Sequence, residues 1–351
     1  MGFRGSIVLA VAACVALAAC SGEETGALPP LGTVLDQTTV SGISSGAYMA
    51  GQFQMAHAKI VTGAAIIAGG PYGCAESAFS GMVFGPFETV LNAKKAISGC
   101  MQNSMAAWGV PNPELLADKA RERAADGAID PVENVISDRV YLFSGTNDRT
   151  VYPAIVASAA EFYRRLGVPE ASIRFVSDLP AGHAFVTETQ GATCSTSEKP
   201  YIVDCDYDQV KDLLTHLLGA VAPPSQSVSG QYVAFDQGAY GGDRSTSGMA
   251  DTGIVYIPEQ CRGGGCRVHV AYHGCAQNRE TIGDAFVEQT GFARWADTNK
   301  LVVLFPQTVA TGSNPHGCWD WWGYTGRDFL TRDAPQIRAV AAMLERLSEK
   351  P

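Results

Sequence analysis

A serine stands between two glycines in the segment Gly42-Ile43-Ser44-Ser45-Gly46, which fits the pattern GxSxG. In a nucleophile elbow this pattern forms a tight turn from a strand into a helix, and the turn exposes the serine hydroxyl. A β-like segment precedes the serine, and residues 45–58 after it have helical spacing. The alternative is a glycine turn that caps a helix, with Ser44 purely structural. We expect Ser44 to be a catalytic nucleophile.

A serine hydroxyl becomes a good nucleophile only when a base takes its proton. Three of the six histidines lie inside predicted helices or a predicted strand, where packing or surface roles are expected: His57, His216 and His269. His183 instead follows a predicted strand over residues 172–177, beside Gly182, where the backbone can turn. A loop histidine without a catalytic role is the alternative. We expect His183 to be the base.

The base needs a carboxylate that orients it, and in one common order this acid lies between the serine and the histidine in the chain. Asp148 meets this condition and follows a predicted strand over residues 139–144. It would hold the imidazole in the right tautomer and stabilise the imidazolium. Asp178 is the alternative, but it lies only five residues before His183, which makes the ring harder to reach.

Acyl transfer also needs two donors for the oxyanion, and the backbone amide of Ser45 at a helix start is the first. The second comes from a strand followed by His-Gly, which normally precedes the nucleophile. Here that pattern occurs late, at Val268–Cys275, so the order of parts indicates a circular permutation. The amide of Cys275 is the predicted second donor. An ordinary turn at the end of a strand is the alternative.

The elements that must position these residues alternate between strands and helices. Apolar strands that alternate with helices predict an α/β fold with a largely parallel sheet covered on both faces. The predicted strands are residues 39–43, 61–68, 139–144, 172–177, 231–235, 253–257, 267–272 and 301–305. The predicted helices are residues 45–58, 113–126, 153–166, 208–218, 282–299 and 334–349.

Residues 222–227 (APPSQS) resemble a linker between two halves of the chain. Two separate domains are therefore one interpretation. We prefer a single domain, because each half alone carries only part of the predicted active site.

Bulk composition fits a folded enzyme. Hydrophobic residues make up 46% of the 351 residues and charged residues only 17%, which provides a large core and too little charge for a disordered chain. The formal net charge of -10 disfavours polyanionic partners, so nucleic-acid binding is not expected.

The N-terminus has the pattern of an export signal. Arg4 precedes an apolar run over residues 7–19, which is too short to span a bilayer comfortably. Leu17–Cys20 then fits a lipobox, in which Cys20 is diacylated and anchors the protein to a membrane. We therefore divide the chain into a lipoprotein signal peptide over 1–20, a tether over 21–30 and a catalytic domain over 31–351. In the alternative, an ordinary signal peptide is cleaved nearby and Cys20 is incidental.

Cysteine usage agrees with export, since eight cysteines remain besides Cys14 and Cys20. Their spacing suggests four local pairs: Cys74–Cys100, Cys194–Cys205, Cys261–Cys266 and Cys275–Cys318. Eight cysteines allow 105 connectivities, so spacing alone does not decide between them. A zinc site is the competing interpretation, but no CxxC pair is present, and no metal is expected.

Several separate blocks resemble the poly(3-hydroxybutyrate) depolymerases that have a single-domain, circularly permuted α/β-hydrolase fold. The blocks are SGISSGAYMA, SGTNDRTVYP, AGHAF, FDQ with GMADTGIVYIP, YHGCAQ and GCWDWWGY, and the resemblance covers about Leu35 to the C-terminus. It implies a triad of Ser44, Asp148 and His183. It also implies Ser45 and Cys275 as oxyanion donors, a Cys275–Cys318 disulfide beside the site, and no cofactor.

The implied reaction is ester hydrolysis through an acyl-enzyme, with poly(3-hydroxybutyrate) or its oligomers as substrate. Feruloyl esters, other polyesters and poly(aspartate) stay open as alternatives, because a fold does not fix a substrate. A surface-binding lipoprotein without activity is a further alternative, which a missing triad member would favour.

Aromatic residues are concentrated in the segment after Cys318. Aromatic side chains suit an aliphatic polyester, so we expect this loop to form a wall of the substrate site. The residues concerned are Trp319, Trp321, Trp322 and Tyr324. A buried tryptophan cluster is the alternative.

Overall fold

The structure is a computed structural model that describes residues 1–2, 25–76, 86–102 and 110–351. Its centre is an eight-stranded sheet with the order β4-β3-β2-β1-β10-β11-β9-β8. The first half of the chain contributes β1 (Thr38–Ile43), β2 (Val61–Ile67), β3 (Arg139–Phe143) and β4 (Ile173–Val176). The second half contributes β8 (Gln231–Asp236), β9 (Thr252–Ile257), β10 (Arg267–Tyr272) and β11 (Leu301–Phe305).

The strands from β4 to β11 in this order are parallel, whereas β9 pairs antiparallel with both β11 and β8. The prediction of a largely parallel sheet is therefore confirmed. The two halves of the chain meet where β1 pairs with β10, with Thr39 opposite His269 and Gly42 opposite Tyr272. Strands of both halves thus share one sheet, and the carboxyl ends of β1 and β10 lie side by side.

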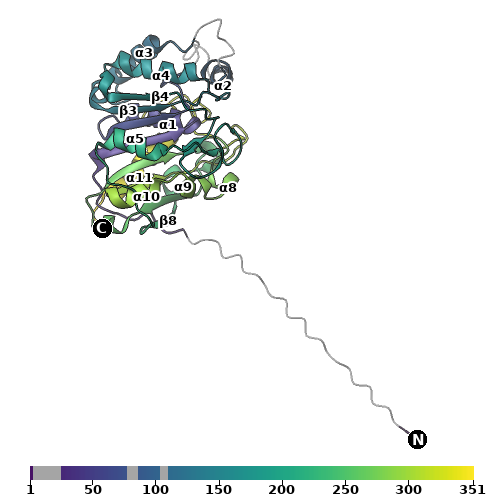
Figure 1. Cartoon of the computed structure of the whole chain (residues 1–351). Helices are drawn as coiled ribbons and strands as arrows, with labels where there is room; N and C mark the ends of the chain where they lie inside the picture. Colours follow the sequence, from purple (N-terminus) through teal and green to yellow (C-terminus); the bar gives the residue numbers. More distant parts are fainter. Residues whose placement is uncertain (3–24, 77–85, 103–109) are drawn as a thin grey trace.

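Helices cover both faces of the sheet (Figure 1). One face packs against α1 (Ser45–Ala56), α3 (Pro113–Ala125), α4 (Pro153–Leu166) and α11 (Pro335–Ser348). The other face packs against α5 (Gln209–Leu218), α9 (Ala285–Gln289) and α10 (Phe292–Asn299). The remaining α-helices are α2 (Pro86–Cys100), α6 (Gly238–Gly241), α7 (Arg244–Ser247) and α8 (Arg279–Ile282).

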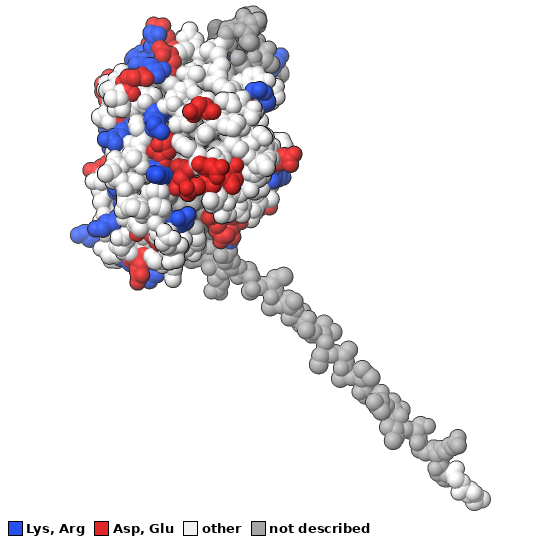
Figure 2. All heavy atoms as spheres, in the orientation of Figure 1, with Lys and Arg blue, Asp and Glu red and all other residues white. Residues whose placement is uncertain are grey.

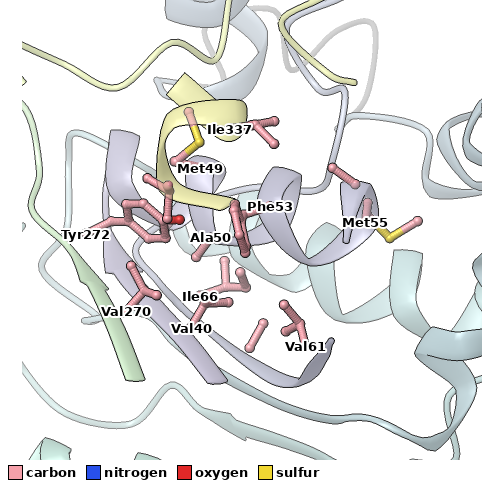
Figure 3. Close-up of a cluster of buried hydrophobic side chains, with 14 of the residues drawn as sticks. Val40, Met49, Ala50, Phe53, Met55, Val61, Ile66, Val270, Tyr272 and Ile337 are labelled. Carbon is pink, nitrogen blue, oxygen red and sulfur yellow. The ribbon is translucent and has the colours of Figure 1, made fainter. Parts of the chain in front are cut away.

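Helix α1 is buried along its whole length. Its side chains Met49 and Phe53 lie over Val40 and Val270 of the neighbouring strands, and Ile337 of α11 lies close by (Figure 3). Most of its side chains are apolar or small, and its buried Gln52 and Gln54 have hydrogen-bond partners, which suits a helix in a protein interior. Each large side chain buried there contributes about 1.5–3 kcal/mol of hydrophobic stabilisation. The start of α1, which follows Ser44, is therefore fixed in the core.

The predicted helix over residues 282–299 is wrong, because the structure divides this segment among α8, α9 and α10. Gly283 and Gly291 interrupt it with φ angles of 61° and 89°, in the left-handed region where glycine carries no steric penalty. Helix α2 was not predicted, nor was a small sheet of β5 (Phe185–Thr187), β7 (Ile202–Asp204) and β6 (Ala192–Thr193), in this order.

The packed part of the chain begins before the predicted boundary at Leu31. Gly26 forms a β-bridge with Phe235 of the edge strand β8, and Leu28 is completely buried. The predicted tether over 21–30 is therefore wrong from Gly26 onward, because backbone pairing and an apolar side chain hold this segment to the sheet. Residues 3–24, which include Cys20 and the rest of the predicted signal peptide after its first two residues, lie outside the described residues. No helix in the described ranges is both long and apolar enough to cross a membrane.

All four cysteine pairs suggested by the spacing are formed as disulfides, including Cys275–Cys318. Within the described part of the chain, no group of three or more His, Cys, Asp or Glu side chains could hold a metal ion.

Candidate active site

Ser44 occupies a sharp turn between β1 and α1, with φ 57° and ψ -121°. A non-glycine residue at positive φ is strained and persists only where the surroundings enforce it. The two glycines of the motif make this turn sterically feasible. A Cβ on Gly42 would lie 2.1 Å from the carbonyl oxygen of Gly46, and one on Gly46 would lie 2.4 Å from those of Tyr272 and His273. The GxSxG pattern is thus a packing requirement of the turn.

Asp148 and His183 form a buried pair. Asp148 Oδ2 lies 2.8 Å from His183 Nδ1, and the aspartate side chain has no solvent exposure. Asp148 Oδ1 accepts the backbone N–H groups of Thr150 and Val151 at 2.8 and 2.9 Å. The carboxylate is therefore held on both oxygens and fixes the ring orientation. The alternative acid, Asp178, is exposed, and no hydrogen bond within the described part of the chain joins it to the ring.

The loops that carry this pair are joined to each other. The N–H groups of Thr146 and Asn147 donate to the carbonyl oxygens of Leu179 and Ala181 at 2.8 and 3.1 Å. A Cβ on Gly145 would lie 2.1 Å from the Ala181 oxygen, so the loops touch where glycine stands. The loops after β3 and β4 therefore form one unit, and the distance between acid and base is set by backbone contacts.

A further segment supports the histidine. The N–H of His183 donates to the Ser197 hydroxyl at 2.8 Å, and the N–H of Gly182 donates to the Cys194 carbonyl at 2.9 Å. Cys194 is bonded to Cys205, which closes this segment into a loop. The support from Ser197 was not predicted from the sequence, because this serine stands fourteen residues after the histidine and is not part of a recognisable motif.

One cavity brings the predicted nucleophile and base together. Ser44, His183 and Cys275 all line a cavity of about 160 Å³. Its other lining residues are Ile43, Met101, Thr150, Ser197, Tyr201, Gly274 and Gln277. Within the described residues, no hydrogen bond joins the Ser44 hydroxyl to the His183 ring. Catalytic hydrogen bonds are often long in a free enzyme and tighten when substrate binds.

The turn after β10 lies directly beside Ser44. A Cβ on Gly274 would lie 3.3 Å from Ser44 Cβ. The Gly274 carbonyl accepts from His273 Nδ1 at 2.8 Å and from the Gln277 N–H at 3.2 Å. In a trans peptide the N–H points opposite to the carbonyl, so the Cys275 N–H faces away from these partners. This geometry suits the predicted role of Cys275 as an oxyanion donor.

His273 itself is structural. It is completely buried, and burial lowers its pKa to about 4, so the ring is neutral at pH 7. Its Nε2 accepts the Thr308 N–H at 3.2 Å, which leaves the proton on Nδ1 for the Gly274 carbonyl. The histidine of the His-Gly pair therefore shapes the turn.

The aromatic loop differs from the prediction. Trp319 is completely buried against Tyr272 and His273, with ring centroids 4.9 and 5.5 Å apart. Its predicted contact with substrate is therefore wrong, since it packs against the end of β10 and the turn that follows. Trp321 is only 5% exposed and stacks on Tyr48 at 4.0 Å, so its main contact is also internal.

Trp322 and Tyr324 are half-buried, with their ring centroids 4.9 Å apart. Neither lines the cavity beside Ser44. The buried carboxylate of Asp320 fixes their backbone, since it accepts the N–H groups of Trp322, Gly323, Tyr324 and Thr325 at 2.7–3.2 Å. This role of Asp320 was not predicted, because an acid between tryptophans has no distinctive spacing.

Comparison with known proteins places this geometry in a family, although no protein-family model matches the chain. A protein from Delftia acidovorans, named poly(3-hydroxybutyrate) depolymerase, is 37% identical over 98% of this chain. The chain spans 66% of that relative's length. A polyhydroxybutyrate depolymerase from Talaromyces funiculosus is 31% identical and is matched over 95% of both proteins.

Solved structures agree. A PHB depolymerase from Penicillium funiculosum has a TM-score of 0.79 and 30% identity, over 92% of this chain and 98% of its own. A PHB depolymerase complexed with an R3HB trimer has a TM-score of 0.80 with the same identity and coverage. These neighbours confirm the predicted α/β-hydrolase fold, in which β1, before Ser44, comes early in the chain and β10, before Cys275, comes late. The chain belongs to the poly(3-hydroxybutyrate) depolymerase family.

Proposed function

We propose that this protein hydrolyses ester bonds of poly(3-hydroxybutyrate) or its oligomers through an acyl-enzyme on Ser44. The observation that carries the proposal is the buried Asp148–His183 pair, which opens onto the same cavity as Ser44. Serine, histidine and carboxylate in this relation are the parts of a catalytic triad. The names of the relatives and the trimer bound by one structural neighbour supply the substrate class.

In the proposed reaction Ser44 Oγ attacks the ester carbonyl carbon while His183 Nε2 takes the hydroxyl proton. The tetrahedral intermediate then collapses, the ester C–O bond breaks, and His183 gives its proton to the leaving alcohol oxygen. A water molecule attacks the acyl-enzyme in the same way, with His183 again as base. Asp148 keeps the Nδ1 proton in place and stabilises the charged ring during both steps.

The backbone amides of Ser45 and Cys275 are the proposed oxyanion donors. Ser45 is the first residue of α1, where the N–H groups have no partner within the helix. No acceptor among the described residues takes either N–H. Such donors are typically worth about 10²–10³ in kcat each.

The cavity favours a neutral ester over a polyanion. Among the described residues that line it, none is a lysine or arginine. Acidic side chains gather near the middle of the face shown in Figure 2, whereas lysines and arginines are scattered. Poly(aspartate) would therefore find no compensating cation among the described residues that line the cavity. The half-buried rings of Trp322 and Tyr324 are proposed to offer an apolar surface for polyester chain beyond the cavity.

Export and anchoring are part of the same proposal. Four disulfides suit an oxidising compartment, and the lipobox that ends at Cys20 predicts a diacylglyceryl anchor. Mass spectrometry of the mature N-terminus tests the anchor, because an unmodified end would contradict it.

Turbidity clearing of poly(3-hydroxybutyrate) granules tests the function. The wild type and Ser44→Ala are compared with Ser348→Ala, which removes an exposed hydroxyl at the end of α11. We expect Ser44→Ala to lose at least about 10³-fold in rate and Ser348→Ala to match the wild type. Feruloyl esters and poly(aspartate) serve as competing substrates.

Two results would contradict the proposal. One is clearing by Ser44→Ala at the wild-type rate. The other is a wild type that binds granules without releasing product, or that cleaves only a competing substrate.

A further inference from the structure

Gln277 has a buried side chain, and both the oxygen and the nitrogen of its amide form hydrogen bonds. It is 2% exposed, and its Oε1 accepts the N–H of Gly274 at 2.7 Å. Its Nε2 donates to the carbonyl oxygens of Pro200 and Tyr201 at 2.9 and 3.1 Å. The side chain therefore joins two segments that lie more than seventy residues apart in the sequence.

The first segment is the oxyanion turn. Gly274 is held at its N–H by Gln277 Oε1, and at its carbonyl by His273 Nδ1 and by the Gln277 N–H. With both groups occupied, Gly274 offers no donor to a substrate. The N–H of Cys275 is then the amide of this turn that remains for the oxyanion.

The second segment supports the catalytic histidine. The Tyr201 carbonyl also accepts the N–H of Phe185, two residues past His183, at 2.8 Å. Ser197, which accepts the His183 N–H, lies three residues before Pro200 in the same disulfide-closed loop. A shift of this loop would move the support of the histidine.

We propose that Gln277 is a positioning residue, which sets the oxyanion turn and the histidine-supporting loop in one fixed relation. The inference rests on the proposed function, since it concerns the geometry of that same reaction. Gln277 touches both segments and provides the one acceptor and two donors that they require, a combination that only an amide side chain offers. A leucine of similar size would leave the Gly274 N–H and the Pro200 carbonyl without partners.

The chain provides a matched control in Gln237. It is completely buried, its Oε1 accepts the N–H of Gln307 at 2.8 Å, and its Nε2 donates to the carbonyls of Ala250 and Gln307 at 2.7 and 2.8 Å. It does not line the cavity beside Ser44. Gln237→Leu therefore breaks the same kinds of bonds away from the proposed machinery.

The test compares Gln277→Leu with Gln237→Leu on p-nitrophenyl butyrate. Competent sites are counted by the stoichiometric release of p-nitrophenol from a p-nitrophenyl phosphonate, which separates lost protein from lost rate. We expect Gln277→Leu to lower kcat per competent site about 30- to 100-fold with KM within about threefold, because a misplaced donor acts in the transition state. Its rate of phosphonate inactivation should fall in parallel. Gln237→Leu should lower the urea midpoint but keep kcat per site within about twofold.

Gln277→Glu serves as a second variant, because it keeps the oxygen that accepts the Gly274 N–H and loses the donors to the other loop. Its kcat per site should lie between those of the wild type and Gln277→Leu, or below the wild type if the leucine variant does not fold. Wild-type kcat per site in both Gln277 variants, or equal losses in the two leucine variants, would overturn the inference. If Ser44→Ala stays active, the proposed function itself fails.

Discussion

Among single residues, Asp148 has both of its carboxylate oxygens occupied by hydrogen bonds. Its buried carboxylate has no contact with water, and three hydrogen bonds replace that solvation: two from backbone N–H groups and one from the His183 ring. A buried charge without such partners would cost several kcal/mol. This arrangement holds the acid in place and leaves one oxygen for the histidine alone.

Substitution of Asp148 tests the role of its Oδ2, the oxygen that bonds to the His183 ring. Asp148→Asn keeps the shape of the side chain, but an amide in place of the carboxylate no longer stabilises the imidazolium and favours the wrong tautomer. We expect kcat on p-nitrophenyl butyrate to fall by about 10⁴-fold, with an unchanged circular dichroism spectrum. A folded variant that retains more than a tenth of the wild-type kcat would show that Asp148 does not orient the base.

Part of the candidate site could be predicted from residue types and their spacing, and part could not. Ser44, Asp148 and His183 stand at strand ends in motifs with a chemical reason, and the structure brings all three to one place. The predicted contact of Trp319 with substrate was wrong, because a large apolar ring is equally typical of a buried core and of a binding surface. Gln277 was not predicted, because its role depends on hydrogen-bond partners that only the fold brings together.

At the scale of elements, the register of two strands sets the site. The loop after β1 carries Ser44 and the loop after β10 carries Cys275, so their separation follows from the pairing of these strands. The buried ring of His269 on β10 bonds to the hydroxyls of Thr39 and Ser41 on β1, at 2.8 and 2.7 Å. Burial lowers the pKa of His269 to about 3, so this link stays neutral. A shift of the β1–β10 register by one residue would break both hydrogen bonds of His269.

The second prediction concerns the contact between the loops after β3 and β4. A methyl group in Gly145→Ala would lie 2.1 Å from the Ala181 oxygen, so the loops must separate. We expect kcat on p-nitrophenyl butyrate to fall by at least about 10²-fold, since a misplacement near 1 Å costs that much. The control is Gly312→Ala, whose new Cβ has nothing within 4 Å and should be neutral. Equal kcat values in the two variants would show that this contact does not set the site.

The sequence pattern predicted the strands of the eight-stranded sheet, because most of them are short apolar runs between turns. It failed over residues 282–299, where an apolar repeat continues across Gly283 and Gly291. Hydrophobic spacing reports which face is buried, but it does not report where the backbone turns between helices. Helix α2 was not predicted, because it buries the small side chains of Ala96 and Cys100 and leaves the larger Phe87, Val90 and Ile97 exposed. Hydrophobic spacing therefore does not mark its packed face.

At the scale of the whole molecule, a buried acid outside the site links stability to pH. Asp138 is 3% exposed, and its Oδ2 accepts from Gln54 Nε2 at 2.7 Å. Gln54 Oε1 in turn accepts from the Tyr163 hydroxyl at 2.8 Å. Burial raises the pKa of Asp138 to about 7, well above the ordinary value for aspartate.

The third prediction follows from this raised pKa. The folded state holds a proton on Asp138 that the unfolded state has already released above about pH 4. The stabilisation is therefore present at low pH and is lost as the pH rises through about 7. Between pH 5 and pH 8 we expect the wild type to lose about 2 kcal/mol more free energy of unfolding than Asp138→Asn. Urea denaturation at both pH values measures this difference, and identical losses in the two proteins would contradict it.

Covalent labelling by a phosphonate tests whether His183 activates Ser44. The enzyme is treated with a p-nitrophenyl alkylphosphonate, digested and examined by mass spectrometry, beside a His183→Ala variant. We expect one adduct, on the peptide that contains Ser44, and we expect it to form at least about 10³-fold more slowly in His183→Ala, which lacks the imidazole. An adduct on another serine, or equally fast labelling of Ser44 in the His183→Ala variant, would contradict it.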